Sequence, residues 1–167
     1  VANLSAHKAG WDERWDFFSE WAIKGQEYKE QLLFLVDEDT NAFNKIIDGF
    51  RMPKDTDLEK KIRLDAIEDA TKYATEIPFK VMETSFKSME VMQAMLRDGL
   101  KNSLSDAGVG VLCARAAVIG AYFNVRINAK DIKDRDFATA ILSKAVIIYE
   151  KTIAMEQETI SYIDSQM

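Results

Sequence analysis

The scarcity of proline and glycine constrains this chain more than any other feature of its sequence. Only two prolines and seven glycines occur in 167 residues. Sandwiches and barrels of short strands need a turn about every eight to twelve residues, and these two residue types build most turns. The sequence therefore predicts an all-α fold in which residues 1–167 form one domain, a bundle of long helices. Its 47% hydrophobic and 30% charged residues suit a globular domain.

Hydrophobic spacing and capping signals divide the chain into helices. The turn at Pro53 ends one helix, and Thr56 with Glu59 three residues later forms the capping box that begins the next. Asp134 is expected to cap the last helix, and Pro78 is expected to kink the longest one. The expected helices span about 1–8, 11–51, 56–98, 105–128 and 134–166.

The helix expected at 105–128 has almost no polar face. Between Ala107 and Val125 its only charged residue is Arg115. Such a helix is either buried in a core or spans a membrane. Its richness in Ala and Gly, and the lack of an aromatic belt, favour a central buried helix covered by its neighbours or by a second copy of the chain. We therefore expect a bundle around this buried central helix and no membrane partner.

Charge and cysteine content exclude several function classes. A net charge of −6 without a basic run argues against a nucleic-acid surface. One cysteine, Cys113, and one histidine, His7, cannot supply a disulfide, a Cys-rich zinc site or a catalytic triad, so no metal is expected. We expect Cys113 to be a small core residue, His7 to be a surface residue, and the compartment to be the reducing cytoplasm, because no signal peptide begins the sequence.

Asp39 is the most unusual carboxylate in the sequence. At 100° per residue it falls in the middle of an apolar helical stripe. Burying the anion there is costly, so Asp39 either finds a neighbouring helix end or Arg as partner, or its pKa rises towards that of a general acid or base. Asp37 and Glu38 point elsewhere, which argues against a metal site. The stripe consists of Tyr28, Leu32, Leu35, Val36, Ala42, Phe43, Ile46 and Phe50.

A second face, on the helix at 105–128, combines small and polar residues. Small residues allow close approach of another helix or of a flat ligand, and Asn124 with Asn128 supplies two amides one turn apart. A tight helix crossing with satisfied amides and a ligand site both remain open. The face consists of Asp106, Gly110, Cys113, Ala117, Gly120, Ala121, Asn124 and Asn128.

Two blocks carry a family resemblance over essentially the whole chain. The first is Leu35-Val36-Asp37-Glu38-Asp39-Thr40-Asn41-Ala42-Phe43, followed by Arg51-Met52-Pro53-Lys54. The second is Gly120-Ala121-Tyr122-Phe123-Asn124-Val125-Arg126-Ile127-Asn128, preceded by Ser105-Asp106. In this order and spacing they resemble the cyclodeaminase domain of the formiminotransferase-cyclodeaminase family.

The resemblance implies a helical, homodimeric domain acting in histidine degradation and one-carbon metabolism. It would convert 5-formiminotetrahydrofolate, with or without a polyglutamate tail, to 5,10-methenyltetrahydrofolate and ammonia, with no tightly bound cofactor. Asp39 matches the family's catalytic acid/base, the second Asp of the Leu-Val-Asp-x-Asp motif. The expected substrate-binding residues are Asn124 and Asn128 for the pterin or amide, Asp106 and Ser105 at the far end of their helix, and Lys8, Lys54 and Arg126 for the glutamate tail.

Two other functions are compatible with the resemblance. One is a methenyltetrahydrofolate cyclohydrolase on the same scaffold, and the other is a non-catalytic dimerisation module of a bifunctional enzyme with a formiminotransferase domain upstream. The family carries a Gly-rich segment ahead of the stretch that resembles residues 1–4. We expect this chain to lack that N-terminal helix, which would leave one wall of the folate pocket incomplete.

Overall fold

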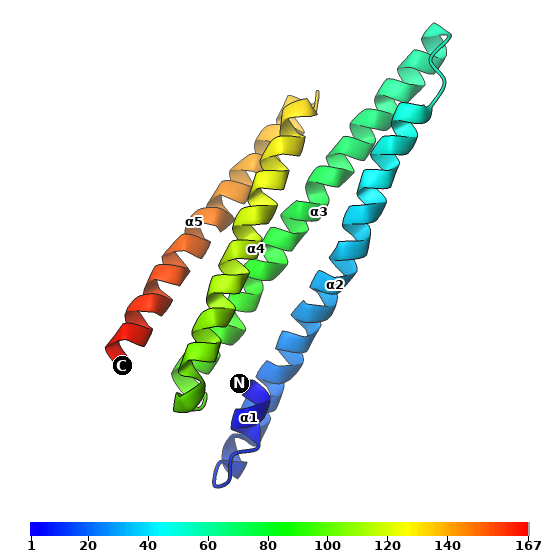
Figure 1. The fold of residues 1–167 in the computed structure, drawn as a ribbon. Helices are drawn as coiled ribbons and strands as arrows, with labels where there is room; N and C mark the ends of the chain where they lie inside the picture. Colours follow the sequence, from blue (N-terminus) through cyan, green and yellow to red (C-terminus); the bar gives the residue numbers. More distant parts are fainter. Residues whose placement is uncertain (167) are drawn as a thin grey trace.

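A computed structural model describes residues 1–166 as an all-helical bundle (Figure 1). Within these residues there is no strand, which confirms the expected fold class. Single 3₁₀ turns precede α2 (Asp12–Arg14) and α4 (Lys101–Ser103). The helices are α1 (Ala2–Ala6), α2 (Trp15–Arg51), α3 (Asp57–Asp98), α4 (Leu104–Asp131) and α5 (Arg135–Gln166).

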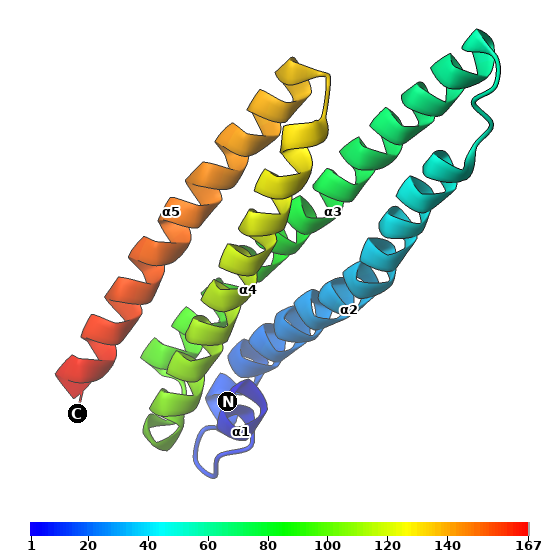
Figure 2. The ribbon, with the colours of Figure 1, turned by 45° about the horizontal axis from the view of Figure 1, so that its top comes forward.

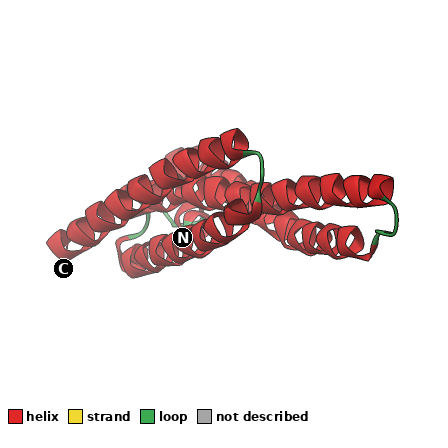
Figure 3. Ribbon diagram, turned by 90° about the horizontal axis from the view of Figure 1, so that it is seen from above, coloured by secondary structure: helices red, strands yellow, loops and turns green. Residues whose placement is uncertain are grey.

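The helices α3 and α4 carry most of the packing. Helix α3 contacts α2, α4 and α5, while α4 contacts α3 and α5. Helices α2 and α4 run in one direction, and α3 and α5 run in the other (Figures 1 and 2). Both described chain ends and the α3–α4 turn lie at the lower end of Figure 1. At the upper end α2 and α3 extend beyond the other two long helices, and Figure 3 shows this arm from above.

Local signals explain where the helices begin and end. The Thr56 side chain accepts a hydrogen bond from the Glu59 backbone N–H (3.2 Å), and the Glu59 carboxylate accepts one from the Thr56 backbone N–H (2.8 Å). This confirms the capping box. Helix α3 continues through Pro78, which is buried. Helix boundaries agree with the sequence-based expectations to within a few residues.

The buried residues of the core repeat every seven positions along three of the long helices. Fully or almost fully buried residues recur at this spacing along α3, α4 and α5. A seven-residue apolar repeat is typical of left-handed, coiled-coil-like packing of long helices. The repeats are Thr75, Met82, Met89 and Leu96 in α3; Val111, Val118, Val125 and Ile132 in α4 and its end; and Ala138, Ala145, Thr152 and Thr159 in α5.

Helix α4 is buried on one side only. Its opposite side exposes large apolar residues, with Phe123 52% and Ile127 58% exposed. The expectation that Cys113 is a core residue is wrong, because Cys113 lies on this exposed side. Within a single chain α3 is therefore the central helix. The periodicity of α4 identified two apolar sides, but it could not show that this chain covers only one of them.

The exposed apolar surface of α4 is long enough to raise the question of a membrane. The segment 101–131 is the one helix in the described part of the chain with the length and composition of a membrane span, with a mean hydropathy of 1.5 over its most apolar window. One third of that window is buried against the other helices. Core helices of soluble proteins have the same length and composition, so this test does not identify a membrane protein.

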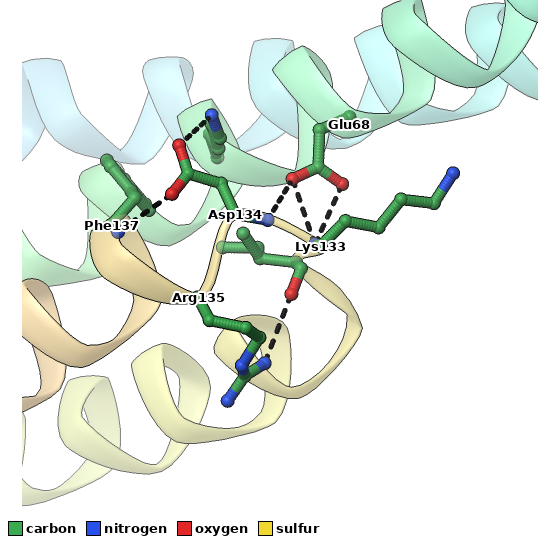
Figure 4. A network of polar contacts seen from close by, with 7 residues as sticks. Glu68, Lys133, Asp134, Arg135 and Phe137 are labelled. Carbon is green, nitrogen blue, oxygen red and sulfur yellow. Dashed lines mark hydrogen bonds and ion pairs between the residues drawn. The ribbon is translucent and has the colours of Figure 1, made fainter.

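A polar network fixes the corner between α4 and α5 against α3 (Figure 4). The Glu68 carboxylate accepts hydrogen bonds from the backbone N–H groups of Lys133 (2.9 and 3.0 Å) and Asp134 (3.0 Å). The Asp134 carboxylate caps α5 by accepting from the Phe137 N–H (3.0 Å), as expected, and also pairs with Lys72 (2.8 Å). The corner therefore holds the start of α5 on α3.

Candidate functional site

Asp39 lies at the edge of the α2–α3 contact and not within it. The buried residues of α2 opposite α3 are Leu35, Ala42 and Gly49. On a helical wheel their mean direction lies about 60° from Asp39, and the Asp39 side chain is exposed. Apolar neighbours on the same side are exposed as well, with Val36 at 64%. The stripe is therefore only partly buried in the single chain, because Leu35 and Ala42 are buried whereas Val36, Asp39 and Phe43 are exposed.

Glu38, not Asp39, connects this part of α2 to α3. The Tyr73 hydroxyl donates a hydrogen bond to the Glu38 carboxylate, and the Asn41 amide donates a second (3.0 Å). These hydrogen bonds, that from Tyr73 above all, hold the pKa of Glu38 below its ordinary value. Sequence periodicity directs Glu38 away from the apolar stripe but does not pair it with Tyr73, because the two residues lie on different helices and far apart in the sequence.

Asn128 connects α4 to the same level of α3. Its amide nitrogen donates to the backbone carbonyl of Ala74 (2.7 Å), and Ala74 is the neighbour of Tyr73. This is the satisfied-amide arrangement that the sequence left open for a helix crossing. Asn124, one turn earlier on α4, is exposed. Its amide is therefore accessible as both donor and acceptor.

A cavity of about 320 Å³ lies between the first part of α2, the end of α3 and the start of α4. Its lining includes Gly25 of α2, Asp106 of α4 and Met92 of α3. Asp39 follows Gly25 by fourteen residues, close to four helical turns, and Asn124 follows Asp106 by eighteen, which is five turns. Each pair therefore shares one side of its helix. Since α2 and α4 run in the same direction, Asp39 and Asn124 lie several helical turns above this cavity and are not part of its lining.

The three basic residues expected at the glutamate tail do not converge. Lys8 lies at the lower end of the bundle, Lys54 lies in the α2–α3 turn at the upper end, and Arg126 is exposed on α4. Arg126 lies over the Tyr122 ring, 5.5 Å from its centroid. Within one chain these side chains cannot hold one short tail together, because long helices separate them. Ser105 is exposed in the first turn of α4.

Other polar residues give little further support for catalysis. No group of three His, Cys, Asp or Glu side chains that could hold a metal ion occurs within residues 1–166. His7 is exposed, as expected.

The arrangement of helices is that of a known class of helical enzyme. Over 99% of this chain and 77% of the other, the fold matches the crystal structure of formiminotetrahydrofolate cyclodeaminase from Thermotoga maritima, with a TM-score of 0.78 and 20% sequence identity. At this identity the match establishes the shared all-helical fold.

Sequence comparison identifies the family. A sequence model of the formiminotransferase-cyclodeaminase family matches residues 1–146, so the chain belongs to this family. The methenyltetrahydrofolate cyclohydrolase of Methylorubrum extorquens is 28% identical over 100% of this chain and 80% of its own length. The formimidoyltransferase-cyclodeaminase of Mus musculus is 36% identical over 64% of this chain, and that of Gallus gallus is 34% identical over 66%.

The relatives differ in how much of their length this chain represents. The match covers 80% of the bacterial cyclohydrolase but only 20% of the mouse and chicken proteins. The family resemblance of the two sequence blocks is confirmed. The names of the bacterial relative and of the matching crystal structure both refer to tetrahydrofolate derivatives, so the chain is related to enzymes that interconvert folates.

Proposed function

We propose that this chain is a formiminotetrahydrofolate cyclodeaminase whose acid/base group is Asp39. N10 of the folate attacks the carbon of the protonated formimino group on N5, a C–N bond forms, and the former imine nitrogen, after gaining the proton from N10, leaves as ammonia, which gives the 5,10-methenyl product. The observation that supports this most strongly is the family match over residues 1–146, which includes the Leu-Val-Asp-x-Asp block with Asp39 exposed on α2.

The reaction needs one proton to be moved between two nitrogens. N10 loses its proton as it attacks, and the leaving nitrogen must gain one before ammonia departs. A single carboxyl group near both nitrogens can do this, and such catalysis contributes about 10² to 10⁴ in rate. Because the attack is intramolecular, holding N5 and N10 in the reactive geometry supplies much of the remaining acceleration.

A second copy of the chain would complete this site. A carboxyl group works best as acid and base when its pKa is near the working pH, and removal from water raises the pKa of an Asp. Asp39 and its apolar neighbours Val36 and Phe43 are exposed in the single chain, Val36 at 64% and Phe43 at 61%. We therefore propose a homodimer in which the partner covers the apolar sides of α2 and α4.

The polar residues of α4 would then bind different parts of the substrate. Asn124 has a free amide to orient the pterin ring, whereas the Asn128 nitrogen is committed to Ala74 and leaves its oxygen as an acceptor. Asp106 and Ser105 are about 27 Å from Asn124 along α4, at 1.5 Å per residue. They would therefore meet the far end of a folate and not its pterin.

The test is Asp39→Asn in the complete protein, with Asp37→Asn as the matched control. Both residues are exposed carboxylates of α2, but they point in different directions. Ammonia release should fall by about 10²-fold or more in the Asp39 variant and remain unchanged in the Asp37 variant. Near-normal ammonia release by Asp39→Asn would show that the acid/base assignment is wrong.

A methenyltetrahydrofolate cyclohydrolase is the second candidate, since a relative with that name aligns along the whole chain. In that reaction water adds to the methenyl carbon, and the bond between this carbon and N5 then breaks. The same carboxyl group would move a proton from the water to N5. Methenyl absorbance should grow from the formimino substrate for a cyclodeaminase, and decay from the methenyl substrate for a cyclohydrolase. Failure to bind folate at millimolar concentration would favour a non-catalytic dimerisation module instead.

The partner and compartment can be tested separately. Phe123→Glu should convert a dimer to a monomer in sedimentation, whereas Ile147→Glu, an equally exposed position on α5, should not. A monomeric parent protein would refute the dimer. The names of the mouse and chicken relatives support a formiminotransferase domain upstream of this chain. The exposed thiol of Cys113 supports a reducing compartment such as the cytoplasm.

A further inference from the structure

A large cleft lies at the lower end of the bundle, far from Asp39. It forms where the segment before α2, the end of α3, the α3–α4 turn and the end of α5 meet (Figure 1). Its volume is about 720 Å³, and we call it the basic cleft because its lining includes four cationic side chains and one carboxylate. The cationic side chains are Lys8, Arg14, Arg97 and Lys101, and the carboxylate is that of Asp98.

One cation of the basic cleft has a structural role. Arg14 pairs with the Asp98 carboxylate (3.0 Å), and it also donates to the Asp98 backbone carbonyl (3.3 Å). This contact joins the start of α2 to the end of α3 and neutralises the single carboxylate of the lining. Among residues 1–166, Lys8, Arg97 and Lys101 form no ion pair or side-chain hydrogen bond. Three cationic side chains around one cleft therefore have no ion-pair partner within residues 1–166, in a chain whose net charge is −6.

A buried hydroxyl without a partner lies beside this cleft. A smaller cavity of about 180 Å³ shares Arg97 and Tyr162 with the basic cleft, and its wall contains Thr159 and Glu158. Thr159 is only 4% exposed, and its Oγ1 has no hydrogen-bond partner in the described part of the chain. A buried hydroxyl without a partner is costly, and an oxygen atom of a ligand would satisfy it.

An aromatic side chain completes one wall. Trp11 is half-buried and stacks on Phe18 with ring centroids 5.6 Å apart. The Lys8 ammonium lies 4.2 Å from the centroid of the Trp11 ring. Binding of an anion next to Lys8 would change the surroundings of the indole, so Trp11 is a natural reporter of occupancy.

We propose that the basic cleft binds a multiply charged organic anion carrying carboxylate or phosphate groups. The three free cations come from three separate segments around the cleft, which suits anionic groups spaced along a molecule better than a single small ion. Charge-assisted hydrogen bonds from Arg and Lys are the interactions that recognise both groups. The cleft is distinct from the proposed folate reaction site, because Arg14 in its lining is the N-cap of α2 and precedes Asp39 by roughly 38 Å along that helix.

The test is a titration of the complete protein with three probes, tripolyphosphate, citrate and tri-γ-glutamate, followed by calorimetry and tryptophan fluorescence. Saturable binding of at least one probe is expected. Preference for tripolyphosphate would identify a phosphate-bearing ligand, and preference for citrate or tri-γ-glutamate would identify a carboxylate ligand. Absence of saturable binding of all three probes would overturn the proposal.

Charge-matched variants separate the basic cleft from general electrostatics. The double variant Arg97→Gln/Lys101→Gln should bind the preferred probe about tenfold more weakly. Lys29→Gln/Lys61→Gln removes the same charge from exposed positions elsewhere and should bind like the parent protein. Equal weakening in the two double variants would refute a specific site. Trp11→Phe should bind with a smaller fluorescence change, and Asp39→Asn should bind normally whatever its catalytic outcome.

Discussion

Removing the Glu68 carboxylate should detach the α4–α5 corner from α3. This carboxylate accepts three hydrogen bonds from two backbone N–H groups, at 2.9 to 3.0 Å. A hydrogen bond to a charged group contributes about 1.5 to 3 kcal/mol when buried. The corner is close to solvent, so we expect about 1 kcal/mol for each N–H group and about 2 kcal/mol in total for Glu68→Ala. For a chain of this length that lowers Tm by about 4 to 8 °C.

The pH dependence of this effect has a definite sign. Desolvation acts to raise the pKa of Glu68, but the hydrogen bonds from the backbone of Asp134 and Lys133 outweigh it and hold the pKa below its ordinary value. The contribution of Glu68 to the free energy of unfolding is therefore complete above the ordinary Glu pKa of about 4.3. It is lost as the pH falls through the lower pKa that Glu68 has in the folded state.

Urea denaturation at pH 7 and at several values below pH 4 measures both quantities. Glu68→Gln keeps one acceptor oxygen and should lose about half as much stability as Glu68→Ala. Asp65→Ala removes a nearby exposed carboxylate of α3 and serves as the control. The reasoning is refuted if Glu68→Ala is no less stable than the control at pH 7, or if the difference persists undiminished in acid.

Two further predictions concern the core and the α2–α3 contact. Met82→Ala should lower the free energy of unfolding by about 2 to 5 kcal/mol in urea titrations, because Met82 is fully buried between α3, α4 and α5; a loss below 1 kcal/mol would contradict this packing. Burial and the hydrogen bond to Glu90 (2.5 Å) raise the pKa of Tyr28 to about 12. The contribution of the Tyr28 hydroxyl to the free energy of unfolding is therefore complete below pH 10 and is lost as the pH rises through 12. Tyr28→Phe should therefore lose less stability than the parent protein between pH 10 and 12, and equal losses would argue against the contact.

The boundaries of the helices were predictable because each boundary depends on a few residues that are neighbours in the sequence. The capping box at Thr56 and the cap at Asp134 were identified from short motifs, and both occur in the structure. The helix was also expected to continue through Pro78, and α3 does so. Pro78 occupies the middle of α3 without ending the helix, and it is buried. The packing of α3 against several neighbours outweighs the hydrogen bond that a proline removes.

The candidate site was less predictable because it depends on what covers each helix side. Periodicity correctly grouped Asp39 with apolar residues, but it could not show that α3 packs beside this stripe and leaves Asp39 exposed. The same reason explains Cys113. Contacts such as Glu38 with Tyr73, or Asn128 with the Ala74 carbonyl, join helices far apart in sequence and depend on their relative rotation. A single sequence does not specify that rotation.

The unequal lengths of the helices have a consequence for local unfolding. Helices α2 and α3 have 37 and 42 residues, whereas α4 has 28, so their upper ends pack only on each other beyond the Glu68 corner. Leu58 and Phe50 near this tip are 69% and 55% exposed. Such a segment opens at lower free energy than the core, and a protease should cut the native protein first in the turn at 52–56. The two fragments would stay associated through the buried part of the α2–α3 contact, with Asp39 on one and Asn128 on the other.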